Sequence, residues 1–141
     1  MRIDSLILKN FRGYTDEKFS FLPGSNLLIG PNASGKTTVL EGLSVALGGF
    51  FLGISGTDSR SIRRDDARLQ VFHGGELPNF EHQYPVEVSA TGELFGKNIC
   101  WSRGLSGKEN RTTSKDALEI KALALKANED IRAGVYKGLP L

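Results

Sequence analysis

The residues with the clearest chemical potential lie in one short stretch, LLIGPNASGKTTVLEGLSVAL, which runs from residue 27 to residue 47. Gly30, Gly35, Lys36 and Thr37 match the pattern G-x-x-x-x-G-K-S/T, which is that of a phosphate-binding loop, or P-loop. So short a pattern also occurs by chance. The segments on either side therefore decide whether it marks a binding site.

A triphosphate needs many hydrogen-bond donors at close range, and backbone N–H groups that converge at a helix N-terminus provide them. Glycine lets the backbone approach the phosphates, and small side chains stay clear of them. Lys36 would reach the β- and γ-phosphates as a point charge, and the Thr37 hydroxyl would be a metal ligand for Mg²⁺. The predicted cofactors are ATP and Mg²⁺, and the predicted binding residues of the loop are Gly30, Pro31, Asn32, Ala33, Ser34, Gly35, Lys36, Thr37 and Thr38.

Both flanks agree with a P-loop. Leu27, Leu28 and Ile29 form an apolar run without polar alternation, which predicts a buried strand of a mostly parallel sheet. After the loop, apolar residues recur at three- and four-residue steps, as on one face of a helix, and Gly48-Gly49 predicts where that helix ends. The residues of this face are Val39, Leu40, Leu43, Ala46 and Leu47.

The segment before the loop predicts two short strands and a turn. Its apolar residues alternate and then resume after a break at Gly13-Tyr14, with a second break at Pro23-Gly24. These apolar residues are Ile3, Leu6, Leu8, Phe11, Phe19 and Phe21. Small nucleotide kinases of the P-loop class usually place the loop on their first strand, whereas a hairpin comes first here.

Residues 50–83 predict a long polar connection with at most one short helical turn, because Gly, Ser, Arg and Asp dominate without a sustained period. Four arginines lie within nine residues, at Arg60, Arg63, Arg64 and Arg68, but three aspartates lie among or close to them. Two interpretations stay open. The arginines form a salt-bridged surface, or one of them contacts DNA phosphate or nucleotide.

Residues 84–104 predict an antiparallel hairpin, because apolar and polar residues alternate on both sides of a turn at residues 96–98. We expect Trp101 in the core rather than on a nucleic-acid base, and Cys100 as a packed residue rather than a nucleophile. Residues 114–133 predict a helix that packs its apolar stripe on the sheet, with a stop at Gly134.

Composition narrows the class of protein. The chain has 141 residues, of which 39% are hydrophobic, as in an ordinary globular domain. Its net charge of +2 argues neither for nor against nucleic acid. It has neither an export leader nor an apolar stretch of about 18 residues, so we expect a cytoplasmic protein without a membrane partner. A single cysteine fits a reducing compartment.

Two segments carry a family resemblance: LILKNFRGY at residues 6–14 and NLLIGPNASGKTTVLEGLSVAL at residues 26–47, followed by the predicted antiparallel pair. The sequence resembles the head domain of ABC-type ATPases of the SMC, RecF and OLD kind, including bacterial proteins with an OLD- or Septu-like head. The likeness is firm over residues 1–50 and looser beyond. It implies an α/β P-loop NTPase fold with an antiparallel β layer, of which residues 1–141 are the N-terminal part.

The resemblance also implies a function. Mg-ATP would gate a homodimer of two heads in DNA repair or antiphage defence, with DNA and an effector nuclease as further partners. Arg12, after the first strand, resembles the family position that approaches the nucleotide. The alternative there is an ordinary surface ion pair. Phe11 and Tyr14 are also at distances where such proteins place an aromatic ring on adenine, but we expect Phe11 in the core and Tyr14 on the turn surface.

This sequence departs from the family pattern in two ways. Ala33 stands where many relatives carry glycine, and a methyl group there should be tolerated. No apolar strand ends in Asp-Glu, the acidic pair that positions the attacking water, since Glu129-Asp130 is reversed and lies on a helical segment. We therefore assign no catalytic residue and expect ATP hydrolysis only of a full-length protein. The alternatives are a small P-loop kinase and an ATP-binding module without hydrolysis.

Overall fold

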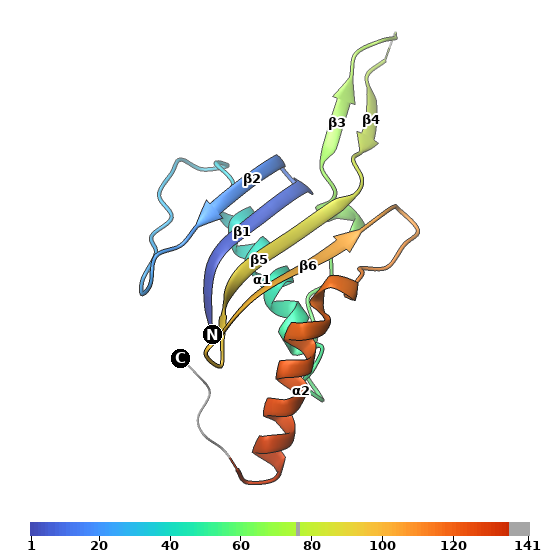
Figure 1. The fold of residues 1–141 in the computed structure, drawn as a ribbon. Helices are drawn as coiled ribbons and strands as arrows, with labels where there is room; N and C mark the ends of the chain where they lie inside the picture. The colour runs from blue at the N-terminus through green and yellow to red at the C-terminus, as the bar shows by residue number, and fades with distance from the viewer. Residues whose placement is uncertain (76, 136–141) are drawn as a thin grey trace.

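The computed structural model describes residues 1–75 and 77–135. Within them, four antiparallel strands form the main sheet in the order β2-β1-β5-β6. Their bounds are Arg2–Phe11 for β1, Tyr14–Ser20 for β2, Val86–Leu94 for β5 and Lys97–Leu105 for β6. Two helices, α1 (Lys36–Phe51) and α2 (Leu118–Arg132), lie together on one face of this sheet (Figure 1). The protein is therefore a two-layer α/β structure.

The hairpin expectations on both sides of the P-loop are confirmed. Side chains alternate between the helix-facing side of the sheet and the opposite side, and Leu6 and Leu8 are fully buried. Asn10 has a left-handed backbone, with φ 48°, which interrupts the strand alternation. As a result Phe11, and not Asn10, is the next residue after Leu8 whose side chain enters the core. The turn between β5 and β6 lies at Phe95–Gly96, where both residues have positive φ, as in a two-residue type I′ hairpin.

Trp101 lies in the core, as expected, and its indole Nε1 donates a hydrogen bond to the Ala46 carbonyl at 3.0 Å. Because a buried indole N–H needs an acceptor, this bond fixes where α1 lies against β6. Cys100, one residue earlier, points to the other side of the sheet and is exposed. The expectation that Cys100 is packed is wrong, because the strand alternation that buries Trp101 exposes its neighbour.

The predicted end of the first helix at Gly48-Gly49 is wrong, because α1 continues to Phe51. Both glycines are buried and serve close packing instead of chain termination. A Cβ atom on Gly48 would lie 2.4 Å from Nη1 of Arg103 and 2.7 Å from the carbonyl oxygen of Arg60. Only glycine fits between the helix and these two groups.

Arg103 is a buried cation that the sequence analysis did not single out. It is 2% exposed, and its Nη1 donates to the carbonyls of Val45 at 3.1 Å and Arg60 at 2.5 Å. Burial lowers the pKa of the Arg103 guanidinium below the ordinary arginine value, because desolvation disfavours the charged form. The side chain joins β6 to α1 and to the segment that follows α1.

Residues 50–83 hold more structure than predicted. They contain the short helix η1 (Arg64–Asp66) and a second hairpin of β3 (Leu69–Phe72) and β4 (Asn79–His82), which projects from the body (Figure 1). Its strands are short and mostly exposed on both faces, so no burial pattern marks them in the sequence. The base is held by hydrogen bonds from Arg68 N to Asn10 O and from Gln83 N to Arg68 O, each 2.8 Å.

The predicted C-terminal helix is present as η2 (Lys115–Ala117) followed by α2. Ile120 and Ala124 of its apolar stripe are fully buried, whereas Ile131 is 46% exposed, so the stripe packs only over its first half. The helix ends at Arg132, and Gly134 follows with φ 72°, which fits the predicted stop. In the described part of the chain, no helix is long and apolar enough to cross a membrane.

Candidate functional site

The P-loop leads directly into α1, whose first residue is Lys36. Gly35 precedes the helix with φ 88°, and its carbonyl accepts the first helical hydrogen bond, from Val39 N at 3.1 Å. The N–H groups of Lys36, Thr37 and Thr38 precede that bond and so have no helical partner. No side chain caps this helix end, and its first turn carries no acidic residue. The positive end of the helix dipole is therefore open to an anion.

The Lys36 side chain folds back over the loop. Its Nζ donates to the carbonyl oxygens of Gly30 at 2.7 Å and Pro31 at 2.6 Å, and it lies 3.4 Å from Oγ of Ser34. The ammonium group is thus held beside the same backbone whose N–H groups can bind an anion. Thr37 is exposed on the first turn of α1, so its hydroxyl is accessible to a metal ion.

Ala33 has a left-handed backbone, with φ 64°. A residue with a Cβ atom pays about 1–2 kcal/mol for this conformation, which glycine adopts freely. The departure from glycine at this position therefore costs backbone strain, although the exposed methyl group meets no obstacle of its own.

Tyr14 packs against the loop instead of lying on the turn surface. Its hydroxyl is 3.5 Å from the Ser34 carbonyl oxygen, and its ring meets Phe19 edge to face with centroids 5.3 Å apart. A Cβ atom on Gly35 would lie 2.2 Å from the Tyr14 hydroxyl oxygen. Gly35 is therefore required both for its positive φ and for this contact. Phe11 is fully buried, as expected for a core residue.

Arg12 lies at the β1–β2 turn with φ 51°. Its Nε donates to Oδ1 of Asp66 at 3.0 Å, and its Nη2 forms an ion pair with Glu41 of α1. Asp66 and Glu41 were not singled out by the sequence analysis, because 54 and 29 residues separate them from Arg12. Arg12 thus joins the turn, the P-loop helix and the segment after α1.

The arginine cluster divides into two groups. Arg60 pairs with Asp66, with Nη2 2.9 Å from the carboxylate, and Arg68 Nη1 donates to Oε1 of Gln70 at 3.3 Å. Both therefore serve the fold. Arg63 and Arg64 are exposed, so their side chains are the more accessible ones for a contact to phosphate.

The prediction of a buried strand at Leu27–Ile29 is wrong. The structure has no strand there, and Leu27 and Ile29 are 83% and 84% exposed. The main sheet has the order β2-β1-β5-β6, and none of these strands pairs with residues 27–29. Among the described residues, this run therefore has no neighbouring strand. An apolar run forms a strand only when a neighbour satisfies its backbone groups.

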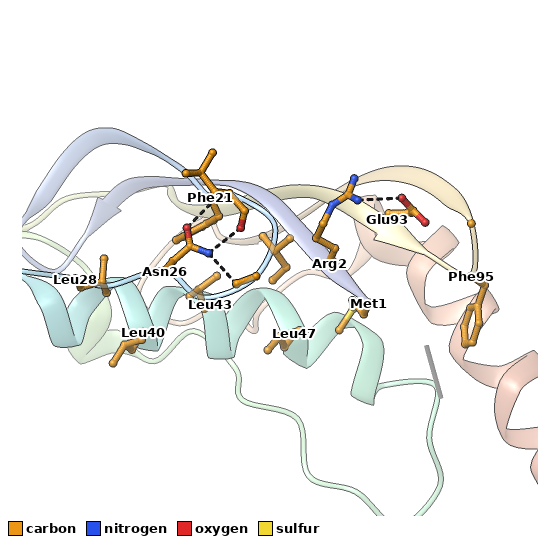
Figure 2. Close-up of a pocket in the computed structure, with 14 residues that line it drawn as sticks. Met1, Arg2, Phe21, Asn26, Leu28, Leu40, Leu43, Leu47, Glu93 and Phe95 are labelled. Carbon is orange, nitrogen blue, oxygen red and sulfur yellow. Dashed lines mark hydrogen bonds and ion pairs between the residues drawn. The ribbon is translucent and has the colours of Figure 1, made fainter. Parts of the chain in front are cut away.

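A groove of about 710 Å³ lies between this segment and α1 (Figure 2). Leu40, Leu43 and Leu47 of α1 form its helical side, and Leu28 and Phe21 lie on the side of the loop segment. The Asn26 side chain shapes this segment: Oδ1 accepts from Leu22 N at 2.9 Å, and Nδ2 donates to Leu22 O at 2.8 Å. Helix α1 thus has the packed sheet on one side and an apolar groove on the other.

A solved structure shares this fold. It comes from a study described as "Structural biochemistry of ATP-driven dimerization and DNA stimulated activation of SMC ATPases". The superposition has a TM-score of 0.56 at 20% identity and covers 96% of this chain and 92% of the other. The chain thus has the P-loop NTPase fold of the ABC/SMC head type.

The model of one protein family, AAA_23, described as AAA domain, matches residues 5–136, and the chain belongs to this family. The DNA replication and repair protein RecF of Lactococcus lactis subsp. cremoris is 46% identical over an alignment of 103 positions, which covers 70% of this chain and 27% of RecF. RecF of Streptococcus agalactiae is 34% identical over 150 residues, covering 99% and 35%. The chain thus spans about a quarter to a third of these curated relatives.

Proposed function

We propose that this chain binds Mg-ATP at Gly30–Thr38 as the N-terminal part of an ATPase head of the SMC/RecF type. The observation that carries the proposal is the uncapped start of α1 beside the ammonium group of Lys36, in a chain that belongs to the AAA domain family. Unpaired backbone donors, a helix dipole and one cation together are suited to a polyphosphate.

The loop, Lys36, Thr37 and Arg12 would contact different parts of Mg-ATP. The loop N–H groups bind phosphate oxygens, and Lys36 exchanges its carbonyl acceptors for the more strongly attracting phosphate oxygens. The Thr37 hydroxyl contributes one oxygen to Mg²⁺, which takes few protein ligands and keeps several waters. Magnesium, when bound, neutralises phosphate charge. Arg12 contributes a second cation from the side of the β1–β2 turn.

Binding without turnover is our proposal for this chain alone. Glu41 of α1 and the buried Asp66 are both paired with arginine. A carboxylate whose oxygens are held by guanidinium groups is not placed to take a proton from an attacking water. ATP hydrolysis is therefore assigned to the full-length protein, and transfer of phosphate to a metabolite, as in a small kinase, has no observation in its favour.

The assembly proposal extends what the solved SMC structure's description says, ATP-driven dimerization and DNA stimulation, to this chain. Mg-ATP would bring two heads together, with Arg63 and Arg64 as the accessible cations for DNA. A further strand would pair with Leu27–Ile29 and cover the apolar groove. A role in DNA repair is supported by the likeness to RecF, and a role in antiphage defence with an effector nuclease rests on the family resemblance alone.

Calorimetric titration with Mg-ATP tests the binding site. Lys36→Ala should lower affinity at least tenfold, or about 1.4 kcal/mol, because a charge-assisted phosphate contact is lost. Thr37→Ala should weaken binding much more with Mg²⁺ than in EDTA, since its hydroxyl is assigned to the metal. Ser44→Ala, on the exposed side of α1, is the matched control. Unchanged affinity in a folded Lys36→Ala protein would reject the site.

A phosphate-release assay tests binding without turnover. The chain should saturate with Mg-ATP at micromolar or weaker affinity, yet release phosphate no faster than Lys36→Ala, with or without double-stranded DNA. Clear release above the Lys36→Ala rate would mean that the chain carries its own catalytic base. Transfer of label from ATP to a nucleoside or metabolite would favour the kinase alternative.

A further inference from the structure

Asp66 is a buried carboxylate at the centre of a small ionic network. It is 1% exposed, and its oxygens accept hydrogen bonds from Nε of Arg12 at 3.0 Å, Nη2 of Arg60 at 3.0 Å and the backbone N of Arg63 at 2.8 Å. Its own carbonyl oxygen accepts from Arg12 N at 2.7 Å. Asp66 therefore holds both the backbone and the side chain of Arg12.

This arrangement is more specific than a stabilising ion pair requires. A buried carboxylate needs partners, and Arg60 together with the η1 backbone already supplies them. Arg12 is the first residue of the two-residue β1–β2 turn, where its φ of 51° is the ordinary hairpin conformation, and it adds a third partner to this carboxylate.

The direction of the Arg12 side chain follows from its second carboxylate. Glu41 lies five residues after Lys36 on α1, which is about 7.5 Å along the helix axis. Tyr14, two residues beyond Arg12, touches the loop at Ser34. The guanidinium thus lies along the first turns of α1. Its Nε and Nη2 are taken by Asp66 and Glu41, and Nη1 has no partner among residues 1–75 and 77–135.

We propose that Asp66 is the positioning residue that orients Arg12 so that its free amino group faces the phosphates of a nucleotide bound at the P-loop. This inference rests on the proposed Mg-ATP site. Asp66 does not touch the nucleotide and acts through Arg12 only. It also follows that the segment carrying Asp66, which continues directly into β3, is linked to the nucleotide site through one side chain.

A double-mutant cycle on the 141-residue chain tests the inference by Mg-ATP titration. Asp66→Asn keeps the shape of the side chain but removes its charge and should lower affinity about tenfold. Arg12→Gln should lower it by a similar factor, and the double variant should lose no more than either single variant. Asp65→Asn, the exposed neighbour in η1, is the matched control and should bind like the unmodified chain.

The outcomes separate the inference from the proposed function. If Lys36→Ala binds as tightly as the unmodified chain, the proposed site is rejected. If Lys36→Ala weakens binding but Asp66→Asn does not, or if the losses at Arg12 and Asp66 simply multiply, only the inference is overturned. Melting temperatures recorded in parallel identify a variant that weakens binding by unfolding.

A measurement on the unmodified chain covers the case in which Asp66→Asn does not fold. The side-chain Nε–H signal of Arg12 can be observed by NMR with ¹⁵N-arginine and assigned with Arg12→Lys. We expect slow solvent exchange before and after Mg-ATP, because Asp66 holds this group, together with a shift on Mg-ATP addition. A signal that does not respond to Mg-ATP would overturn the inference, because a purely structural ion pair would behave in that way.

Discussion

Helix α1 has two apolar faces, of which one is fully packed and the other is only partly buried. Val39, Val45 and Ala46 lie on the sheet and are between 0% and 2% exposed, with Gly42 and Gly49 on the same side. Leu40, Leu43 and Leu47 line the groove beside residues 21–28, where Leu40 remains 55% exposed (Figure 2). A single helix thus belongs both to a finished core and to an open apolar surface.

The two faces differ in how they use side-chain size. Toward the sheet, glycines let the helix approach so closely that a Cβ on Gly42 would lie 2.6 Å from Leu8. Toward the groove, leucines project from the helix and leave room for a further layer. The first face needs close complementarity, because its partner is fixed in the same chain, whereas the second stays open to solvent among the described residues.

The largest expected difference between the faces is the cost of removing a leucine. Leu8→Ala should lower the free energy of unfolding by about 2–5 kcal/mol, because a fully buried side chain leaves a cavity against α1. Leu40→Ala should change it by no more than about 0.5 kcal/mol. Urea unfolding followed by Trp101 fluorescence measures both. Equal losses would show that the groove face is as well packed as the sheet face.

A smaller loss of stability is expected when a methyl group is added on the face of α1 that packs closely against the rest of the protein. Gly48→Ala should lower the free energy of unfolding by about 1–2 kcal/mol, because the clash with the rigid Arg60 carbonyl outweighs the gain in helix propensity. Ser44→Ala, on the exposed side, should be neutral or slightly stabilising. A more stable Gly48→Ala protein would mean that Arg103 and its neighbours can move aside.

Substitutions in the exposed run Leu27–Ile29 should have the smallest effect on stability but should change association between chains. Leu27→Ser combined with Ile29→Ser should reduce self-association, measured by size-exclusion chromatography with light scattering, because an exposed apolar run with unpaired backbone groups favours contact between chains. The free energy of unfolding should stay within about 0.5 kcal/mol. Leu118→Ser on α2, where Leu118 is 62% exposed, is the control. If it reduces self-association as much, the run at residues 27–29 has no particular part in association.

The local features of the fold were predictable from the sequence. Alternation located the strands of both sheet hairpins, and spacing located the P-loop and the start of α1, because these signals arise within a few residues. Gly48 and Gly49 wrongly predicted the end of α1, which continues to Phe51. Their effect depends on Arg60 and Arg103, which come from other parts of the chain.

The surroundings of the site were less predictable. Arg12 was a candidate on resemblance, but its partners Glu41 and Asp66 lie far away in the sequence and carry no local signal. Among seven charged residues between 58 and 68, nothing in the order of residues distinguishes the buried Asp66 from the exposed Asp65. Burial of a charge is decided by what packs around it.

The sequence by itself determined the form of the P-loop, since glycine freedom, a helix start and a lysine at fixed spacing act within one turn of backbone. Tertiary structure decided which apolar residues became core. Leu6 and Leu27 are equally apolar, yet one is fully buried and the other is 83% exposed. The reason is that a strand is stable only with neighbours on its edges, and β1 has β2 and β5, whereas the run at Leu27–Ile29 has none among the described residues.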